Sequence, residues 1–273
     1  MTKLKADLHS HTVISDGVFT VPESIETAKK AGLSHFAITD HDCVVGADEA
    51  AKMAENTDLG INIVYGVELS TLYNKESIHV LGYFKGKTDA LSEVLDKQTA
   101  ERRVRAIEMF DLIQRFYGVD VDRSEVYKKY SITRKTIGEL VVRYSDLSPE
   151  FVTNNITSRE SKCYIPSNKM SLSEGIGLIR DAGGLAVLAH PCLIKKSDPL
   201  DVLKYGFDGI EAVYPSVKND EKRFRLIAKE KGLFVTGGSD FHTFNDNSDD
   251  HGVIGTSTIE GREFELFLER LYG

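Results

Sequence analysis

The sequence predicts an α/β barrel, with strands in the middle and helices outside. Short apolar runs alternate with helical patterns over residues 3–84 and again over residues 171–271, a rhythm typical of parallel sheets covered by helices. The length of 273 residues suits one large barrel, and a hydrophobic content of 41% is enough for a substantial core. Histidines and acids follow many predicted strands, at the end where barrels carry their active sites.

The N-terminal segment contains four expected strands and two expected helices. Pro22 opens the first helix, which runs to about Lys30, and Gly32 lies just past its end, the usual places for these two residue types. The second helix covers residues 47–55. The strands are expected at residues 3–8, 34–39, 61–67 and 78–84.

A charged helical segment then interrupts the alternation. Apolar residues recur near one face of 101–113, and shorter helices are expected at 123–129 and 136–144. We interpret residues 98–169 as a helical insertion that covers the active site, with a barrel of residues 1–97 and 170–273. Roughly 70 residues with few long apolar runs are marginal for folding alone, so we do not expect an independent domain.

The barrel pattern returns after the insertion, and a closing helix ends it. Gly183 and Gly232 follow two of the helices, where glycine is favoured. Strands are expected at residues 185–188, 209–213 and 233–236. Helices are expected at residues 171–181, 199–205, 220–231 and 264–271.

The first strand ends in the motif Asp7-Leu-His9-Ser-His11. Alternate residues of a strand point to one side, so the acid and both histidines share a face. Neutral imidazoles packed this closely are explained by a bound cation. A polar strand edge with solvated histidines is the alternative.

Similar groups follow other strands. Each has a plain alternative reading: a helix-capping loop at residues 39–42, an exposed turn acid at Glu68, or a histidine bonded to backbone at His190. His79 stands near a strand start and joins the others if its strand is antiparallel or leads back toward the same rim. His35 is expected to be structural and His251 solvated. The expected ligands are His9, His11, Asp16, His41, Glu68, His79, His190, Asp240 and His242.

Nine candidates exceed the four ligands of a closed structural zinc site, so they predict two or three divalent ions, particularly if Glu68 bridges. Imidazole and carboxylate ligands without thiolate suit zinc, manganese or iron. Asp7, Asp40 and Asp42 are expected to orient imidazoles through their other ring nitrogen.

The composition limits the kinds of partner and compartment that the sequence suits. A net charge of −8 and a pI of about 5.5 argue against a grip on long duplex nucleic acid. No signal peptide and no apolar run long enough to span a bilayer is visible. Three scattered cysteines, Cys43, Cys163 and Cys192, suit reduced thiols in a cytoplasm.

With these motifs, the sequence resembles the PHP family, named for polymerase and histidinol phosphatase. The matching motifs are Asp-Leu-His-Ser-His11, Ser-Asp-Gly17, Thr-Asp-His-Asp42, Gly-Val-Glu68, His79, Ala-His-Pro191 and Gly-Ser-Asp-Phe-His242. The resemblance implies a distorted (β/α)7 TIM-like barrel with a trinuclear metal site. It is greatest to the small-phosphoesterase branch, which carries a helical insertion.

The resemblance also implies residue roles. His9, His11, Glu68 and Asp240 resemble the ligands of one ion and hold the water that attacks. Asp16, His41 and His242 resemble those of a second ion, and Glu68, His79 and His190 those of a third. Arg102, Arg103 and Arg134 resemble the branch's substrate-binding arginines.

A guanidinium fork matches phosphate oxygens, which supports this role for the arginines. An ordinary solvated helix face with ion pairs is the alternative for Arg102 and Arg103. The expected activity is metal-dependent hydrolysis of a small nucleotide phosphomonoester, the 3'-phosphate of nucleoside 3',5'-bisphosphates. Alternatives are histidinol phosphate, a cyclic nucleotide diester or short RNA 5' ends as substrate, or a metal-binding regulatory module without turnover.

Overall fold

The computed structural model describes residues 4–128, 130–166, 168–244 and 250–273. The chain divides into two compact units. Residues 1–93 and 169–273 form the barrel unit, and residues 94–168 form the helical unit. Within the described ranges, no helix has the length and apolar character needed to cross a membrane.

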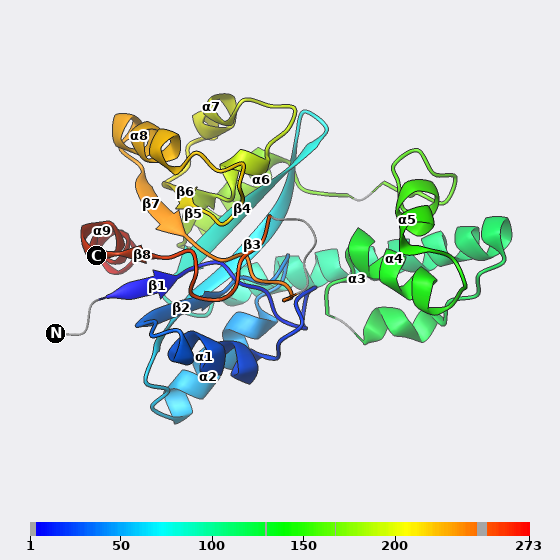
Figure 1. Cartoon of the computed structure of the whole chain (residues 1–273), viewed down its shortest axis with the longest axis horizontal. Coiled ribbons are helices and arrows are strands. Elements are labelled where there is room, and N and C mark those ends of the chain that lie inside the picture. The colour runs from blue at the N-terminus through cyan, green and yellow to red at the C-terminus, as the bar shows by residue number, and fades with distance from the viewer. Residues whose placement is uncertain (1–3, 129, 167, 245–249) are drawn as a thin grey trace. The chain divides into compact units, whose positions relative to one another are not determined.

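The barrel unit is built on one eight-stranded sheet, in the order β7-β6-β5-β4-β3-β2-β1-β8. Neighbouring strands run parallel except where β4 meets β3 and β5, and where β8 meets β1 (Figure 1). The strands are β1 (Lys5–Asp7), β2 (His35–Ile38), β3 (Asn62–Tyr73), β4 (Glu76–Phe84), β5 (Leu185–Leu188), β6 (Gly209–Val213), β7 (Phe234–Gly237) and β8 (Ile259–Glu260).

β3 and β4 form a long antiparallel hairpin, and here the expected strand limits are wrong. β3 continues past Glu68 to Tyr73, because Asn74 and Lys75 both take positive φ angles, of 47° and 63°, and turn the chain back. A two-residue loop of this kind matches the twist of paired strands. His79 therefore lies inside an antiparallel strand and not near the start of a parallel one.

The two ends of the sheet approach each other through the segments that follow β1 and β7. Leu8 N–H donates to the Gly237 carbonyl at 3.0 Å, and Asp240 N–H donates to the His9 carbonyl at 2.8 Å. Ser10 and Phe241 form an isolated parallel bridge. The sheet is thus nearly closed, and the predicted α/β barrel fold is confirmed.

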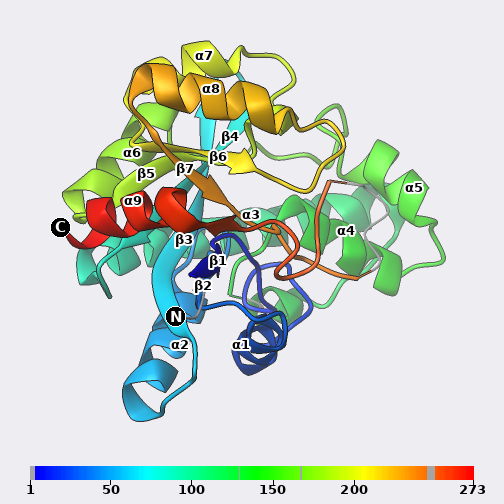
Figure 2. The same ribbon diagram turned by 60° about the vertical axis from the view of Figure 1, so that its left-hand side comes forward.

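Helices pack along the strands of the barrel unit (Figure 2). α1 begins at Val21, has the predicted Pro22 in its first turn and has a capping box between Thr20 and Glu23. Residues 199–205 form two short turns, α7 and η4, where one helix was expected. The helices are α1 (Val21–Lys30), α2 (Val45–Asn56), α6 (Leu172–Asp181), α7 (Pro199–Val202), η4 (Leu203–Tyr205), α8 (Glu221–Lys231) and α9 (Gly261–Tyr272).

The helical unit packs around a core of its own, with Phe110 and Ile137 completely buried in it. Its longest helix, α3 (Asp89–Tyr117), begins just before this unit and contains the predicted stretch 101–113. Of the segment expected at 123–129, the structure shows a 3-10 turn over Arg123–Tyr127, and Lys129 lies outside the described residues, as does Lys3 of the first strand. The unit also contains α4 (Arg134–Arg143), α5 (Pro149–Phe151) and the π-helical turn η2 (Val152–Ile156).

Candidate metal centre

His9 and His11 lie in the extended segment that follows β1, and both are completely buried. Their Nε2 atoms are 3.2 Å apart. Gly238 packs so closely that a Cβ added there would lie 2.2 Å from the Cβ of His9. The segment after β7 therefore needs glycine at this position in order to pass beside the histidines.

Four of the predicted ligands form a first group: His9, His11, Glu68 and Asp240. Asp240 Oδ1 lies 3.1 Å from His9 Nε2 and 3.0 Å from His11 Nε2. Glu68 Oε2 lies 3.4 Å and 3.2 Å from the same two nitrogens. Both nitrogens and both carboxylates therefore face one small volume, the size of a single cation site.

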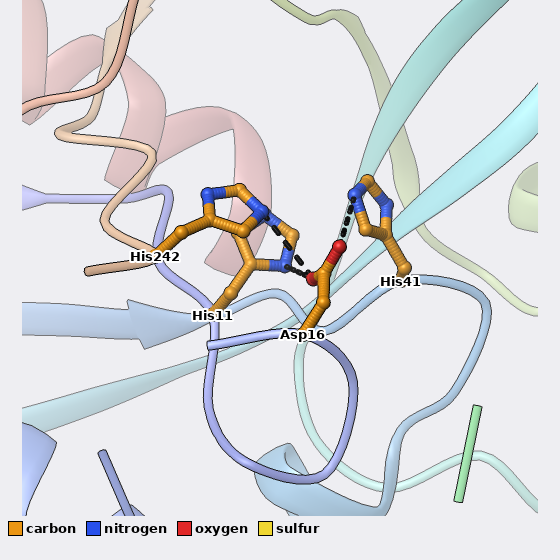
Figure 3. Close-up of side chains that lie close together, drawn as sticks. All are labelled: His11, Asp16, His41 and His242. Carbon is orange, nitrogen blue, oxygen red and sulfur yellow. Dashed lines mark ion pairs between the residues drawn. The ribbon is translucent and has the colours of Figure 1, made fainter. Parts of the chain in front are cut away.

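A second group consists of His11, Asp16, His41 and His242. Figure 3 shows the Asp16 carboxylate between the rings of His11 and His242 on one side and the ring of His41 on the other. Asp16 Oδ1 lies 3.3 Å from His242 Nε2, and Asp16 Oδ2 lies 4.0 Å from His41 Nε2. His11 belongs to both groups, so they are adjacent.

Glu68 connects these positions to a third. Its Oε1 lies 2.9 Å from His79 Nδ1 and 2.9 Å from His190 Nε2, and its Oε2 lies 2.9 Å from His41 Nδ1. All nine predicted ligands thus converge on one place in the barrel unit. Glu68 lies in the middle of β3 and not at the strand end that the apolar pattern predicts.

The charges of this cluster depend strongly on one another. Burial would raise the pKa of Glu68, but nearby positive charge, first of all that of His41, outweighs it and places the pKa well below its usual value. Burial would also raise the pKa of Asp240, but the positive charge of His9 outweighs it and the pKa lies well below its usual value. Burial lowers the pKa of His79 to about 4 despite the nearby Glu68. The carboxylates are therefore charged at neutral pH.

Cations fit this set of groups. Among the described residues, the buried oxygens Asp16 Oδ1, Glu68 Oε2 and Asp240 Oδ1 accept no hydrogen bond of suitable geometry. Buried charged oxygens without partners are costly, and an ion held between them and the ring nitrogens removes that cost. The donor set of imidazole and carboxylate groups without thiolate is one that divalent metals take.

Three residues at the site take backbone conformations that non-glycine residues rarely adopt. Asp42, His190 and Asp240 have φ angles of 52°, 25° and 49°. Each such residue costs about 1–3 kcal/mol and persists where the surrounding structure fixes it. Two of the three are predicted ligands, so the fold accepts strain in order to aim these side chains.

The expected role of the nearby acids is only partly what the structure shows. The carboxylate that meets Nδ1 of His9 is Glu211, at 3.0 Å, and not Asp7. Asp7 accepts from the backbone N–H groups of Ser239 and Gly255, and Asp40 accepts from Thr12 and Ser15. Asp42 accepts from the backbone of Ser70. These acids hold the loops that carry the ligands.

Sequence reasoning missed three residues of the site. Glu211 is completely buried on β6, and its signal was a lone acid within an apolar strand. Tyr214 donates from its hydroxyl to Asp240 Oδ2 at 2.8 Å. His251 stacks on His242, with 4.4 Å between ring centroids, so the expectation that it is solvated was wrong. Its acidic surroundings gave no signal for this contact.

The predicted arginines lie in the helical unit. Arg103 donates to the backbone carbonyls of Val126 and Tyr130, both at 3.3 Å. Arg102 donates to Ser131 Oγ at 3.3 Å. Burial lowers the pKa of Arg105, Tyr164 opposes this, and the positive charges of Arg102 and Arg134 lower the pKa further.

Comparisons with known proteins agree with this geometry. Residues 7–144 match the family model of the PHP domain. The chain is 30% identical to a 5'-3' exoribonuclease of Haemophilus influenzae over 89% of this chain and 91% of that protein. It is 30% identical to a 3',5'-nucleoside bisphosphate phosphatase of Chromobacterium violaceum over 90% of each chain.

A crystal structure gives the same relationship. A protein from Bifidobacterium adolescentis, assigned as a metal-dependent phosphoesterase, superimposes with a TM-score of 0.81 and 27% identity, over 98% of this chain and 96% of that one. The family model, the long alignments and the shared fold all point in one direction. The chain belongs to the PHP domain family and is a hydrolase of the metal-dependent phosphoesterase class.

Proposed function

We propose that this enzyme removes a phosphate from a small nucleotide, the 3'-phosphate of nucleoside 3',5'-bisphosphates. The observation that carries the proposal is the position of Glu68, whose two oxygens each lie 2.9 Å from histidine nitrogens that belong to different groups. A carboxylate shared in this way would suit two ions that act on one phosphate.

The residues that would hold the ions are those that the resemblance to the PHP family implies. His9, His11, Glu68 and Asp240 would hold one ion, Asp16, His41 and His242 a second, and Glu68, His79 and His190 a third. Divalent zinc, manganese or iron bound there lowers the pKa of a water and neutralises charge on phosphate oxygens. The chain's own part is to keep the carboxylates ionised and to keep all of these side chains aimed and shielded by burial.

The arginines of the helical unit support the choice of a bisphosphate. Arg102 and Arg105 line a cavity of about 550 Å³ in that unit. The positive charges of Arg102 and Arg134 act on Arg105, which favours an anion nearby, and the guanidinium fork matches phosphate oxygens. We propose that Arg102 and Arg134 bind the second phosphate. Arg103 stays a predicted member of this set, although its guanidinium donates within the unit.

The test is a substrate panel with metal-loaded enzyme. We expect faster hydrolysis of 3',5'-bisphosphates than of 5'-monophosphates, because only the former offers a second phosphate to the arginines. Equal rates would remove the bisphosphate selectivity, and no turnover of any phosphoester would remove the activity.

Other substrates are arms of the same panel. Short RNA with a 5'-phosphate tests the exoribonuclease alternative, and histidinol phosphate and a cyclic nucleotide test the remaining ones. Histidinol phosphate is disfavoured because its cationic amine would meet the arginines. We also propose a cytoplasmic location, because Cys43, Cys163 and Cys192 form no disulfide within the described residues.

A further inference from the structure

Strand β6 brings a buried acid against two of the proposed ligands. Glu211 Oε1 lies 3.0 Å from His9 Nδ1, and Glu211 Oε2 accepts from the backbone N–H of His190 at 2.7 Å. We infer that Glu211 is a positioning residue, which fixes the tautomer of His9 and the backbone of His190. The inference rests on the proposed function, since both residues are placed for the sake of bound ions.

The two nitrogens of His9 face different surroundings. Nε2 lies 3.1 Å from Asp240 Oδ1 and 3.4 Å from Glu68 Oε2, within the first ligand group. A ring nitrogen that binds a cation carries no proton, so the proton of the neutral ring belongs on Nδ1. Nδ1–H then donates to Glu211, and this hydrogen bond favours the tautomer whose Nε2 is free for the ion.

Position 211 needs a side chain that can accept two hydrogen bonds on two separate atoms. The backbone N–H of His190 is a fixed donor, and Nδ1–H of His9 is the second donor. A carboxylate accepts from both, whereas an amide of the same shape has one acceptor and one donor. In a glutamine variant, the NH2 group could face Nδ1 of His9, which would favour the tautomer whose proton is on Nε2. Otherwise it would face the backbone N–H of His190, and two donors form no hydrogen bond.

The contact with His190 holds a strained residue. His190 has a φ angle of 25°, and its Nε2 lies 2.9 Å from Glu68 Oε1. Tyr214 follows β6, the strand that carries Glu211. Its ring contacts the His190 ring, with 5.4 Å between centroids, and its hydroxyl donates to Asp240. The end of β6 thus supports ligands from three different segments of the chain.

The test compares Glu211→Gln with the wild-type chain. Each is loaded with Mn²⁺, freed of excess metal and analysed for metal per chain, and metal affinity is measured by competition with a chelator. We expect a loss of about 10- to 100-fold in affinity, the usual effect of removing such a partner. With Co²⁺ in place of manganese, the visible spectrum should change, since the ligands around the ion change.

Asp208→Asn is the matched control. Asp208 precedes the same strand and accepts from the backbone of Ala186 at 3.0 Å, which asparagine can also do. We expect its metal content and cobalt spectrum to equal those of the wild type. Circular dichroism and thermal unfolding of the metal-free chains separate positioning from a general loss of stability.

Glu211→Asp gives a second measure, because it keeps two acceptors on a shorter side chain. We expect its metal affinity to fall between those of the wild type and Glu211→Gln. If the glutamine variant fails to fold, reduced affinity in folded Glu211→Asp supports the inference, and wild-type affinity overturns it. Wild-type affinity in Glu211→Gln also overturns it. A wild-type chain that binds no metal would instead overturn the proposed function, together with this inference.

Discussion

Glu68 and His79 lie diagonally across the antiparallel pair of β3 and β4, with 2.9 Å between Glu68 Oε1 and His79 Nδ1. Glu68 pairs with Leu81, so His79 is two residues away and on the same face of the sheet. A one-residue shift of register would send one of the two side chains to the other face. The register of this hairpin therefore decides whether Glu68 can connect the proposed ion positions.

The first prediction concerns Glu68→Gln. The variant removes the charge that faces the ring nitrogens of five histidines and leaves the shape of the side chain unchanged. We expect metal content to fall and phosphatase activity to drop by at least about 100-fold. This exceeds the usual effect of losing a residue that only hydrogen-bonds to a metal ligand, because Glu68 is itself a proposed ligand. Metal analysis and initial rates over a range of metal concentrations measure this. Glu125→Gln, a similarly buried acid of the helical unit, is the control, and a less than tenfold effect at Glu68 would contradict the prediction.

The second prediction concerns metal removal. Ions that bind only the folded chain stabilise it by about 2.7 kcal/mol at a concentration 100 times the Kd. For a chain of this size, that corresponds to a difference of roughly 5–10 °C in Tm. We expect chelation to lower the Tm by this amount and added Mn²⁺ to restore it, as followed by scanning calorimetry. An unchanged Tm would argue against ions at the buried carboxylates.

The third prediction concerns Glu76, at the start of β4. Its carboxylate accepts from the backbone N–H groups of Lys195, Lys196 and Ser197 at 2.7 to 3.1 Å, and so holds the loop that follows His190. Burial alone would raise the pKa of Glu76, but these amides lower it below the usual value. The contribution to stability is therefore present above the unfolded-state pKa and is lost as the pH falls through the lower folded-state pKa.

We expect Glu76→Ala to lower the free energy of unfolding at pH 7 by on the order of 1–3 kcal/mol, since it leaves backbone donors without a partner. Urea unfolding at pH 7 and in the acid range measures it, and the difference from wild type should shrink in acid. Glu26→Gln, at an exposed position of α1, is the control. A difference independent of pH would show that the charge of Glu76 is not the cause.

The fourth prediction separates the arginines. We expect Arg134→Ala to raise the KM for a 3',5'-bisphosphate more than for a monophosphate, with unchanged stability, because it removes a charge of the proposed phosphate cluster. Steady-state kinetics on both substrates measure this. Equal changes for the two substrates would exclude a role in selectivity.

Arg103→Ala tests whether the neighbouring arginine acts on stability and not on the substrate. Its guanidinium donates to the carbonyls of Val126 and Tyr130, so we expect the free energy of unfolding to fall by about 1 kcal/mol. Thermal or urea unfolding measures the change. A larger KM for bisphosphates at unchanged stability would assign Arg103 to the substrate instead.

The sequence by itself determined the barrel and the set of side chains that meet in it. Local signals were enough for this: apolar alternation set the strands, Pro22 and Gly32 limited α1, and the spacing of His9 and His11 put both on one side of the chain. Such signals act over a few residues, so a single sequence shows them directly.

Only the tertiary structure decided the partners of these side chains. The positive φ angles of Asn74 and Lys75 set the register that brings His79 to Glu68. Glu211 reaches His9 across 202 positions of the chain, and His251 reaches His242 from a loop without periodicity. Contacts between remote segments depend on how strands pair and loops pack, and no local pattern encodes that geometry.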